Sequence, residues 1–160
     1  MEFIQGLAEA LEHSGFGVWA RQSPYAYPTA NLIHLLGLVL LVGGIGLLDL
    51  RIVGLFRRLP LAAMSRILTP FALVGLALMI PSGFTLFAAD AGPLSRSATF
   101  GWKLTLIALS LANAIAFRLL WRRNIEGPGI DVPLLGRFMA AASVGLWLWI
   151  AALGRLIAYA

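Results

Sequence analysis

Residues 30–54 read ANLIHLLGLVLLVGGIGLLDLRIVG, and this stretch decides the fold. Between residues 35 and 48 it contains no charged, amide or hydroxyl side chain. A helix needs about 20 apolar residues to cross roughly 30 Å of hydrocarbon, so residues 30–48 are predicted to form a transmembrane span. His34 lies one turn inside this span, and Asp49 and Arg51 mark its far end.

Three further apolar runs predict spans at about residues 67–89, 100–121 and 135–159. The composition agrees, because 60% of the residues are hydrophobic, only 12% are charged and the mean hydropathy is +0.88. A soluble domain carries about twice that charged fraction. The four spans predict an all-α integral membrane four-helix bundle, with residues 1–160 as a single membrane domain. Pro81 is expected to kink the second span.

Residues 1–28 form a different kind of segment. Within residues 2–12, Phe3, Ile4 and Leu7 fall on one helical face and Glu2 and Glu9 on the other. This pattern predicts a short amphipathic helix that lies in the membrane interface. The rings that follow suit the head-group layer: Trp19, Tyr25 and Tyr27. We expect no cleavable signal peptide, since no basic segment precedes an apolar core here. Residues 90–99 are predicted to be a loop because they contain Gly and Pro.

The distribution of basic residues predicts the orientation. Eight of the 12 Lys and Arg residues border the first and third connections: Arg51, Arg57, Arg58, Arg66, Arg118, Arg122, Arg123 and Arg137. Basic loops stay in the cytoplasm, so both termini are expected on the outer side of a bacterial inner membrane. The net charge of +5 therefore indicates a lipid bilayer as partner rather than nucleic acid.

Several chemistries are excluded or unsupported. The chain has no cysteine, which rules out disulfides, thiolate metal sites and iron–sulfur clusters. It has no phosphate-binding glycine loop, no His-Glu-x-x-His motif and no paired carboxylates on one helical face. We therefore do not expect a hydrolytic enzyme.

Three spans bring ionisable side chains to a similar depth on the outer side: His34, Lys103 and Arg155. Asn31 and Tyr159 lie near the same layer. Ionisable groups inside a bilayer usually face the bundle interior or a wet cavity, so these five residues form the candidate cofactor-binding set. The alternative is that Lys103 and Arg155 only extend to the outer head groups.

His34 shares a helical stripe with the small residues Ala30, Gly37 and Gly44. Such a stripe accommodates either a closely packed helix or a flat cofactor. Haem b would take His34 as an axial ligand, and the two cations would hold its propionates; a quinone is the other cofactor considered. The alternative is a histidine hydrogen-bonded within the bundle.

A second axial ligand for haem is not evident from the sequence. The second to fourth spans have no histidine, and His13 is expected on the polar side of the amphipathic helix. Met79 is expected well below the level of His34.

Asp49, Arg51 and Arg118 form a second constellation near the cytoplasmic side. A lone carboxylate in lipid is costly, so Asp49 is expected to form a structural ion pair with Arg51 or Arg118. A proton or cation relay is the alternative. The span centres offer only Ser110, Asn113 and Ser143 for such a relay, which argues against a proton channel.

Three segments resemble a family of small four-span bacterial inner-membrane proteins known as a domain of unknown function. They are YPTANLIHLLGLVLLVGGIGLLDLRIVG (27–54), FGWKLTLIALSLANAIAF (100–117) and LWLWIAALGRLIAYA (146–160). The resemblance implies a four-helix membrane bundle and no particular activity. The first span, a histidine followed by a glycine-rich apolar run, is also similar to copper-resistance D domains and b-type membrane cytochromes.

Three hypotheses for the function follow. The first is a cofactor-binding membrane protein for electron transfer, and the second is a small transporter or permeation element. The third is a structural or accessory subunit, in which the glycine-bearing face of the first span meets a second copy or a larger membrane complex.

Overall fold

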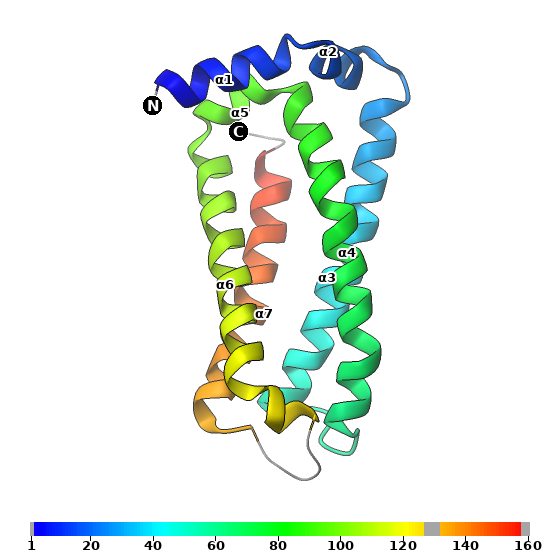
Figure 1. Cartoon of the computed structure of the whole chain (residues 1–160), viewed down its shortest axis with the longest axis vertical. Helices are drawn as coiled ribbons and strands as arrows, with labels where there is room; N and C mark the ends of the chain where they lie inside the picture. The colour runs from blue at the N-terminus through cyan, green and yellow to red at the C-terminus, as the bar shows by residue number, and fades with distance from the viewer. Residues whose placement is uncertain (1, 127–131, 158–160) are drawn as a thin grey trace.

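The computed structural model describes residues 2–126 and 132–157 and is 89% helical, with no strand in these residues. The described helices are α1 (Glu2–Glu12), α2 (Gly15–Gln22), α3 (Ala26–Val53), α4 (Leu61–Ala89), α5 (Ala91–Arg96), α6 (Ala98–Glu126) and α7 (Leu134–Leu156). Helices α3, α4, α6 and α7 run along the long axis of the molecule (Figure 1), and each is long and apolar enough to cross a membrane. The prediction of an all-α four-helix bundle is confirmed, and the chain is a multi-pass membrane protein.

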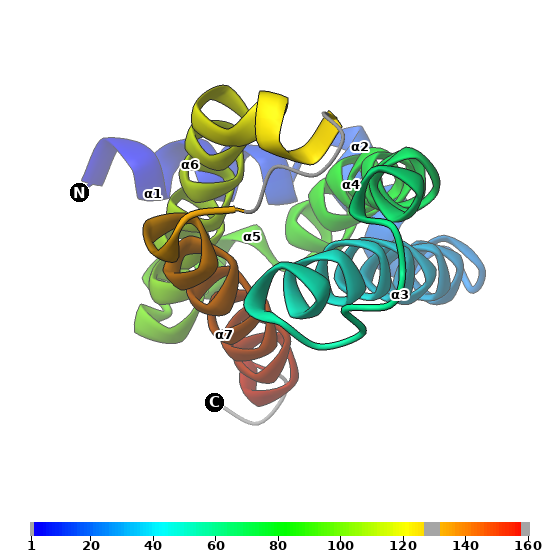
Figure 2. The same ribbon diagram turned by 90° about the horizontal axis from the view of Figure 1, so that it is seen from below.

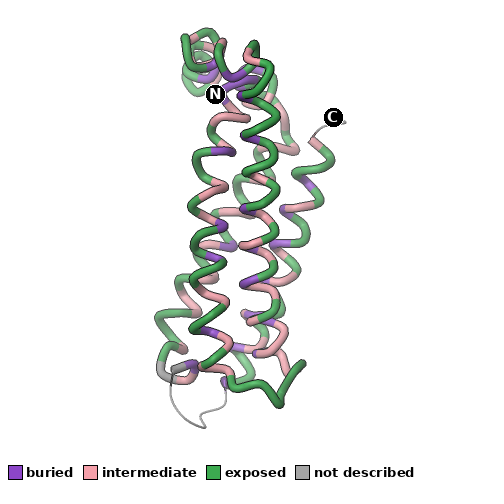
Figure 3. Tube along the Cα trace, turned by 90° about the vertical axis from the view of Figure 1, so that its right-hand side faces the viewer, coloured by how far each residue is buried: buried purple, intermediate pink, exposed green. Residues whose placement is uncertain are grey.

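The four long helices pack unequally. Helix α3 packs extensively against α4, and α7 packs against both α3 and α6, whereas α4 and α6 meet at few positions. Seen along the bundle, the helices therefore follow an arc in the order α4, α3, α7, α6 (Figure 2). Few residues of these helices are fully buried (Figure 3), and many of the exposed ones are large and apolar. Such a surface is stable in lipid and would aggregate in water.

The long helices extend beyond the predicted spans. Helix α3 covers 26–53 instead of 30–48, α4 begins at Leu61, and α6 continues to Glu126. Hydropathy marks only the part of a helix that lies in hydrocarbon, whereas backbone hydrogen bonding continues through the head groups. Helices of 28 and 29 residues are about 42–44 Å long at 1.5 Å per residue, close to the roughly 40–45 Å of a whole bilayer.

Helices α3 and α4 approach each other closely at Gly37 and Gly75. A Cβ atom at Gly75 would lie 2.6 Å from the Gly37 carbonyl oxygen and 2.5 Å from the Leu41 nitrogen. The two backbones therefore touch without side chains between them, as small residues allow in membrane helices. Because Gly37 lies one turn below His34, this contact fixes the imidazole against α4.

The predicted stripe of small residues on α3 faces inward. Ala30, Gly37 and Gly44 are all buried. A Cβ atom at Gly44 would lie 2.8 Å from the Leu68 carbonyl oxygen of α4. Cβ atoms at Gly43 or at Gly46 would have nothing within 4 Å. The inward glycines Gly37 and Gly44 thus allow the close contact with α4. That a partner protein packs against Gly43 and Gly46 stays a prediction.

Helices α1, α2 and α5 lie across one end of the bundle, here called the α1 end (Figure 1). The opposite end, with the connection between α3 and α4, is called the basic end. The amphipathic helix α1 is confirmed over Glu2–Glu12. The prediction of a loop at residues 90–99 was wrong, because this stretch contains helix α5. Proline is tolerated there, since Pro93 lies in the first turn, where N–H groups have no partner within the helix.

Two glutamates hold α1 to α5. The Gly92 N–H donates to Glu12 Oε2 over 2.7 Å, and Arg21 donates to Glu12 Oε1 over 2.6 Å. Arg96 forms an ion pair with Glu9. Gly92 is the second residue of α5, so the Glu12 carboxylate lies at a helix N-terminus, where negative charge is favourable. We call these contacts the α1–α5 clasp.

Gly75→Val is expected to destabilise the bundle by about 1–3 kcal/mol, because the new side chain would overlap the backbone of α3. The thermal unfolding midpoint in detergent would report this loss. Gly43→Val is the matched control, since its Cβ would meet nothing within 4 Å. Equal midpoints for the two variants would contradict the proposed packing.

The α1–α5 clasp is expected to weaken in acid. The hydrogen bond from the Gly92 N–H lowers the pKa of the Glu12 carboxyl; desolvation opposes this shift, and Arg21 adds to it. The pKa of the Glu12 carboxyl is therefore lower in the folded protein than in the unfolded chain. The contribution of Glu12 is complete above about pH 4.3, the ordinary carboxyl value, and is lost as the pH falls through the lower folded value.

A nitroxide on Ala10→Cys would follow this change in its line shape, because the chain has no other cysteine. The label should gain mobility as the pH falls below about 4. Glu12→Gln should reduce this pH dependence, and Glu2→Gln should not. An unchanged profile in Glu12→Gln would exclude the clasp as its origin.

Candidate functional site

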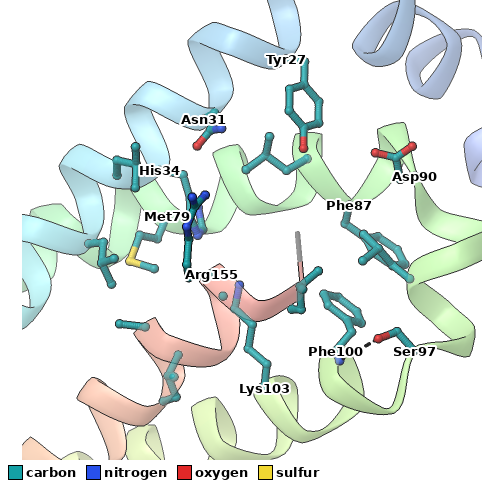
Figure 4. Close-up of a pocket in the computed structure, with 18 of the residues that line it drawn as sticks. Tyr27, Asn31, His34, Met79, Phe87, Asp90, Ser97, Phe100, Lys103 and Arg155 are labelled. Carbon is teal, nitrogen blue, oxygen red and sulfur yellow. Dashed lines mark hydrogen bonds between the residues drawn. The ribbon is translucent and has the colours of Figure 1, made fainter. Parts of the chain in front are cut away.

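A pocket of about 560 Å³ lies at the α1 end, lined by residues of α3, α4, α5, α6 and α7 and of the segments that join them. This volume is within the roughly 300–1,000 Å³ of small-molecule sites. In Figure 4, His34, Lys103 and Arg155 reach the same space from three helices. We call it the His34 pocket.

His34 is held against α4 by Ser82 and Gly83. Its Nδ1 lies 3.1 Å from Ser82 Oγ, and Ser82 Oγ donates to the Leu78 carbonyl over 2.6 Å. A hydroxyl has one hydrogen to donate, and that of Ser82 goes to Leu78, so Nδ1–H is the donor to Ser82. In the neutral ring this tautomer puts the lone pair on Nε2. Gly83 leaves room for the ring, since a Cβ there would lie 3.1 Å from His34 Cε1.

Lys103 crosses from α6 toward α7. A Cβ atom at Gly154 would lie 3.4 Å from Lys103 Nζ, so the absent side chain of Gly154 gives the ammonium its place. Arg155 follows on α7 and also lines the pocket. The His34 pocket thus holds two cations close to one imidazole.

The other two residues of the candidate set are Asn31 and Tyr159. Asn31 lines the pocket one turn above His34 on α3. Tyr159 lies outside the described residues. Four of the five residues of the candidate set therefore reach one pocket.

The remaining walls are mostly apolar. Phe87 and Phe100 stack with ring centroids 5.3 Å apart and planes 5° apart. Other apolar side chains extend the surface inward: Leu35, Leu38, Leu86 and Ile150. A pocket with cations beside apolar walls fits a flat amphiphilic molecule that carries acidic or carbonyl groups.

The sequence did not identify several lining residues. Met79 lies beside Gly37, one turn below His34, and still lines the same pocket. Ser82, which contacts the His34 ring, was not among the candidate residues. Counting residues from the ends of the two helices would have found it, because His34 and Ser82 lie at similar depths. Tyr27 and Asp90 also line the pocket and were not selected.

The basic end has a different arrangement. Asp49 is buried on α3, faces the Ser143 side chain and has no hydrogen-bond partner for Oδ2 in the described part of the chain. Arg51 donates instead to the backbone carbonyls of Leu59 and Arg57, over 2.8 and 3.1 Å. Asp49 takes part in neither of the ion pairs described above, Glu12–Arg21 and Glu9–Arg96.

Within these same residues, no group of three or more His, Asp or Glu side chains could hold a metal ion. A metal in the His34 pocket would therefore have to arrive with most of its ligands, as iron does in a porphyrin.

No protein-family model matches the chain, and no curated protein or solved structure is significantly similar to it. The resemblance to a four-span bacterial family thus stays a prediction.

Proposed function

We propose that this membrane protein binds a redox cofactor, haem b or a quinone, in the His34 pocket and serves electron transfer. The observation that carries the proposal is the hydrogen bond between His34 Nδ1 and Ser82, which leaves a lone pair on Nε2. Metal-ligating histidines are oriented by such a bond at their other ring nitrogen.

The two cations suit both cofactors. Lys103 and Arg155 line the pocket together with His34. Charge-assisted hydrogen bonds from these groups would hold the propionates of haem or a carbonyl oxygen of a quinone. His34 Nε2 would bind iron in the first case and accept a hydrogen bond from a quinol hydroxyl in the second.

The apolar walls support a cofactor that enters from lipid. The stacked Phe87 and Phe100 offer a flat surface, and Met79 adds a thioether on α4. When bound, either cofactor supplies reversible electron transfer, and the chain binds it, orients it and shields it from water. The positive-inside rule puts the α1 end, and with it this pocket, on the outer side of the membrane.

Absorbance tests the haem alternative. After haem-replete expression, the detergent-purified protein should show a Soret band that His34→Ala abolishes. Ser82→Ala should lower haem affinity about 10–100-fold, because Nδ1 loses the acceptor that orients the ring.

The other histidine provides the control. His13 is exposed and bonds only the Glu9 carbonyl, so His13→Ala should leave the spectrum unchanged. A Soret band that survives in His34→Ala would exclude this histidine as the ligand.

Extraction and mass analysis test the quinone alternative. Lys103→Gln should reduce the quinone recovered per protein about tenfold, through loss of a charge-assisted hydrogen bond. Arg137→Gln, at the basic end, is the matched control. A wild-type protein with neither a Soret band nor extractable quinone would refute the proposed function.

A further inference from the structure

A second cavity lies at the basic end, far from the His34 pocket along the bundle. It has a volume of about 410 Å³ and lies between α4 and α6. Arg118 of α6 lines it, together with Ala62, Ser65, Arg66, Thr69 and Pro70 of α4. We call it the Arg66–Arg118 pocket. Two of its lining side chains carry a guanidinium group, those of Arg66 and Arg118.

The depth of this pocket matches the border between head groups and hydrocarbon. Arg66 lies in the second turn of α4, directly before the apolar run that starts at Ile67. Arg118 lies one turn before Trp121, where the apolar run of α6 ends. The phosphate of a lipid in the adjoining leaflet lies at this level.

The polar groups of the pocket suit a phosphate ester. Guanidinium groups bind phosphate oxygens through pairs of N–H donors. Here α4 and α6 each contribute one guanidinium group. The hydroxyls of Ser65 and Thr69, with oxygens 3.4 Å apart, add polar groups on α4. Pro70 has no N–H to donate to the Arg66 carbonyl, which can then accept from a head-group hydroxyl.

The surroundings suit acyl chains. Helices α4 and α6 meet at few positions, so the pocket borders the bilayer. Large apolar side chains next to it along both helices are exposed: Ile67 and Phe71 on α4, Ile115 and Leu119 on α6. A soluble anion would gain nothing from these residues, whereas a lipid would bury its chains against them.

We propose that the Arg66–Arg118 pocket binds an anionic glycerophospholipid, with the phosphate on the two arginines and the acyl chains along α4 and α6. Basic pockets between transmembrane helices bind anionic lipid head groups in this way. The site is independent of the cofactor proposed for the His34 pocket.

Native mass spectrometry of the full chain, released from detergent with added lipid, measures the occupancy. Phosphatidylglycerol should bind at least tenfold better than phosphatidylcholine, and Arg66→Gln and Arg118→Gln should each lower its occupancy about fivefold. Arg66→Lys should retain part of the binding, because it keeps the charge but loses the paired donors. Arg58→Gln, at the same end but outside the pocket, is the matched control.

Three outcomes would overturn the proposal. Equal occupancy by the two lipids would show that charge is not recognised. Arginine variants that bind phosphatidylglycerol as well as Arg58→Gln would show that the site is elsewhere. Displacement of the lipid by millimolar inorganic phosphate would indicate a soluble anion site. If Arg118→Gln lowers the unfolding midpoint, the Arg66 variants keep the test valid.

Discussion

The contact of bare backbone between α3 and α4 at Gly37 and Gly75 sets the geometry of the rest of the bundle. Lipid supplies no hydrophobic drive for helices to associate, so close packing must hold them together. Side chains at these two positions would push the two helices apart and so strain the contact between the His34 imidazole and Ser82. The register between α3 and α4 therefore determines which groups of the two helices face each other at the α1 end.

Charge divides the molecule into two ends with different chemistry. At the α1 end, Lys103 and Arg155 line a pocket that they share with the imidazole of His34. At the basic end, Arg66 and Arg118 lie where the helices separate and lipid is adjacent. The two proposals thus give the basic side chains of each end a different ligand, a cofactor in the His34 pocket and a lipid in the Arg66–Arg118 pocket.

The sequence predicted the fold well because hydropathy alone identifies helices that must satisfy their own backbone in lipid. It also predicted that His34, Lys103, Arg155 and Asn31 share one depth, since each can be counted from the end of its helix. It did not predict the contact between His34 and Ser82, which depends on the rotation of α4 about its axis. Polar helix ends and the short α5 carry no hydropathy signal, so their bounds were missed.

The hydrogen-bond partners of the charged side chains were the least predictable feature of the structure. Asp49 and Arg51 are two residues apart, but successive positions on a helix face different directions. The Arg51 side chain turns back to the carbonyls of the connection between α3 and α4. The sequence alone does not show whether a basic side chain neutralises a carboxylate or, like Arg51, donates hydrogen bonds to the carbonyls of a turn.

The α1–α5 clasp also constrains the order of events during biogenesis. Glu12 and Gly92 are separated by 80 residues, and between them lies the whole hairpin of α3 and α4. Glu12 can therefore form this contact only after that hairpin has inserted and Gly92 has reached the same side of the membrane. If only one of these two spans inserted, the two groups would lie on opposite sides of the bilayer. Formation of the clasp thus requires that both spans of the hairpin cross the membrane.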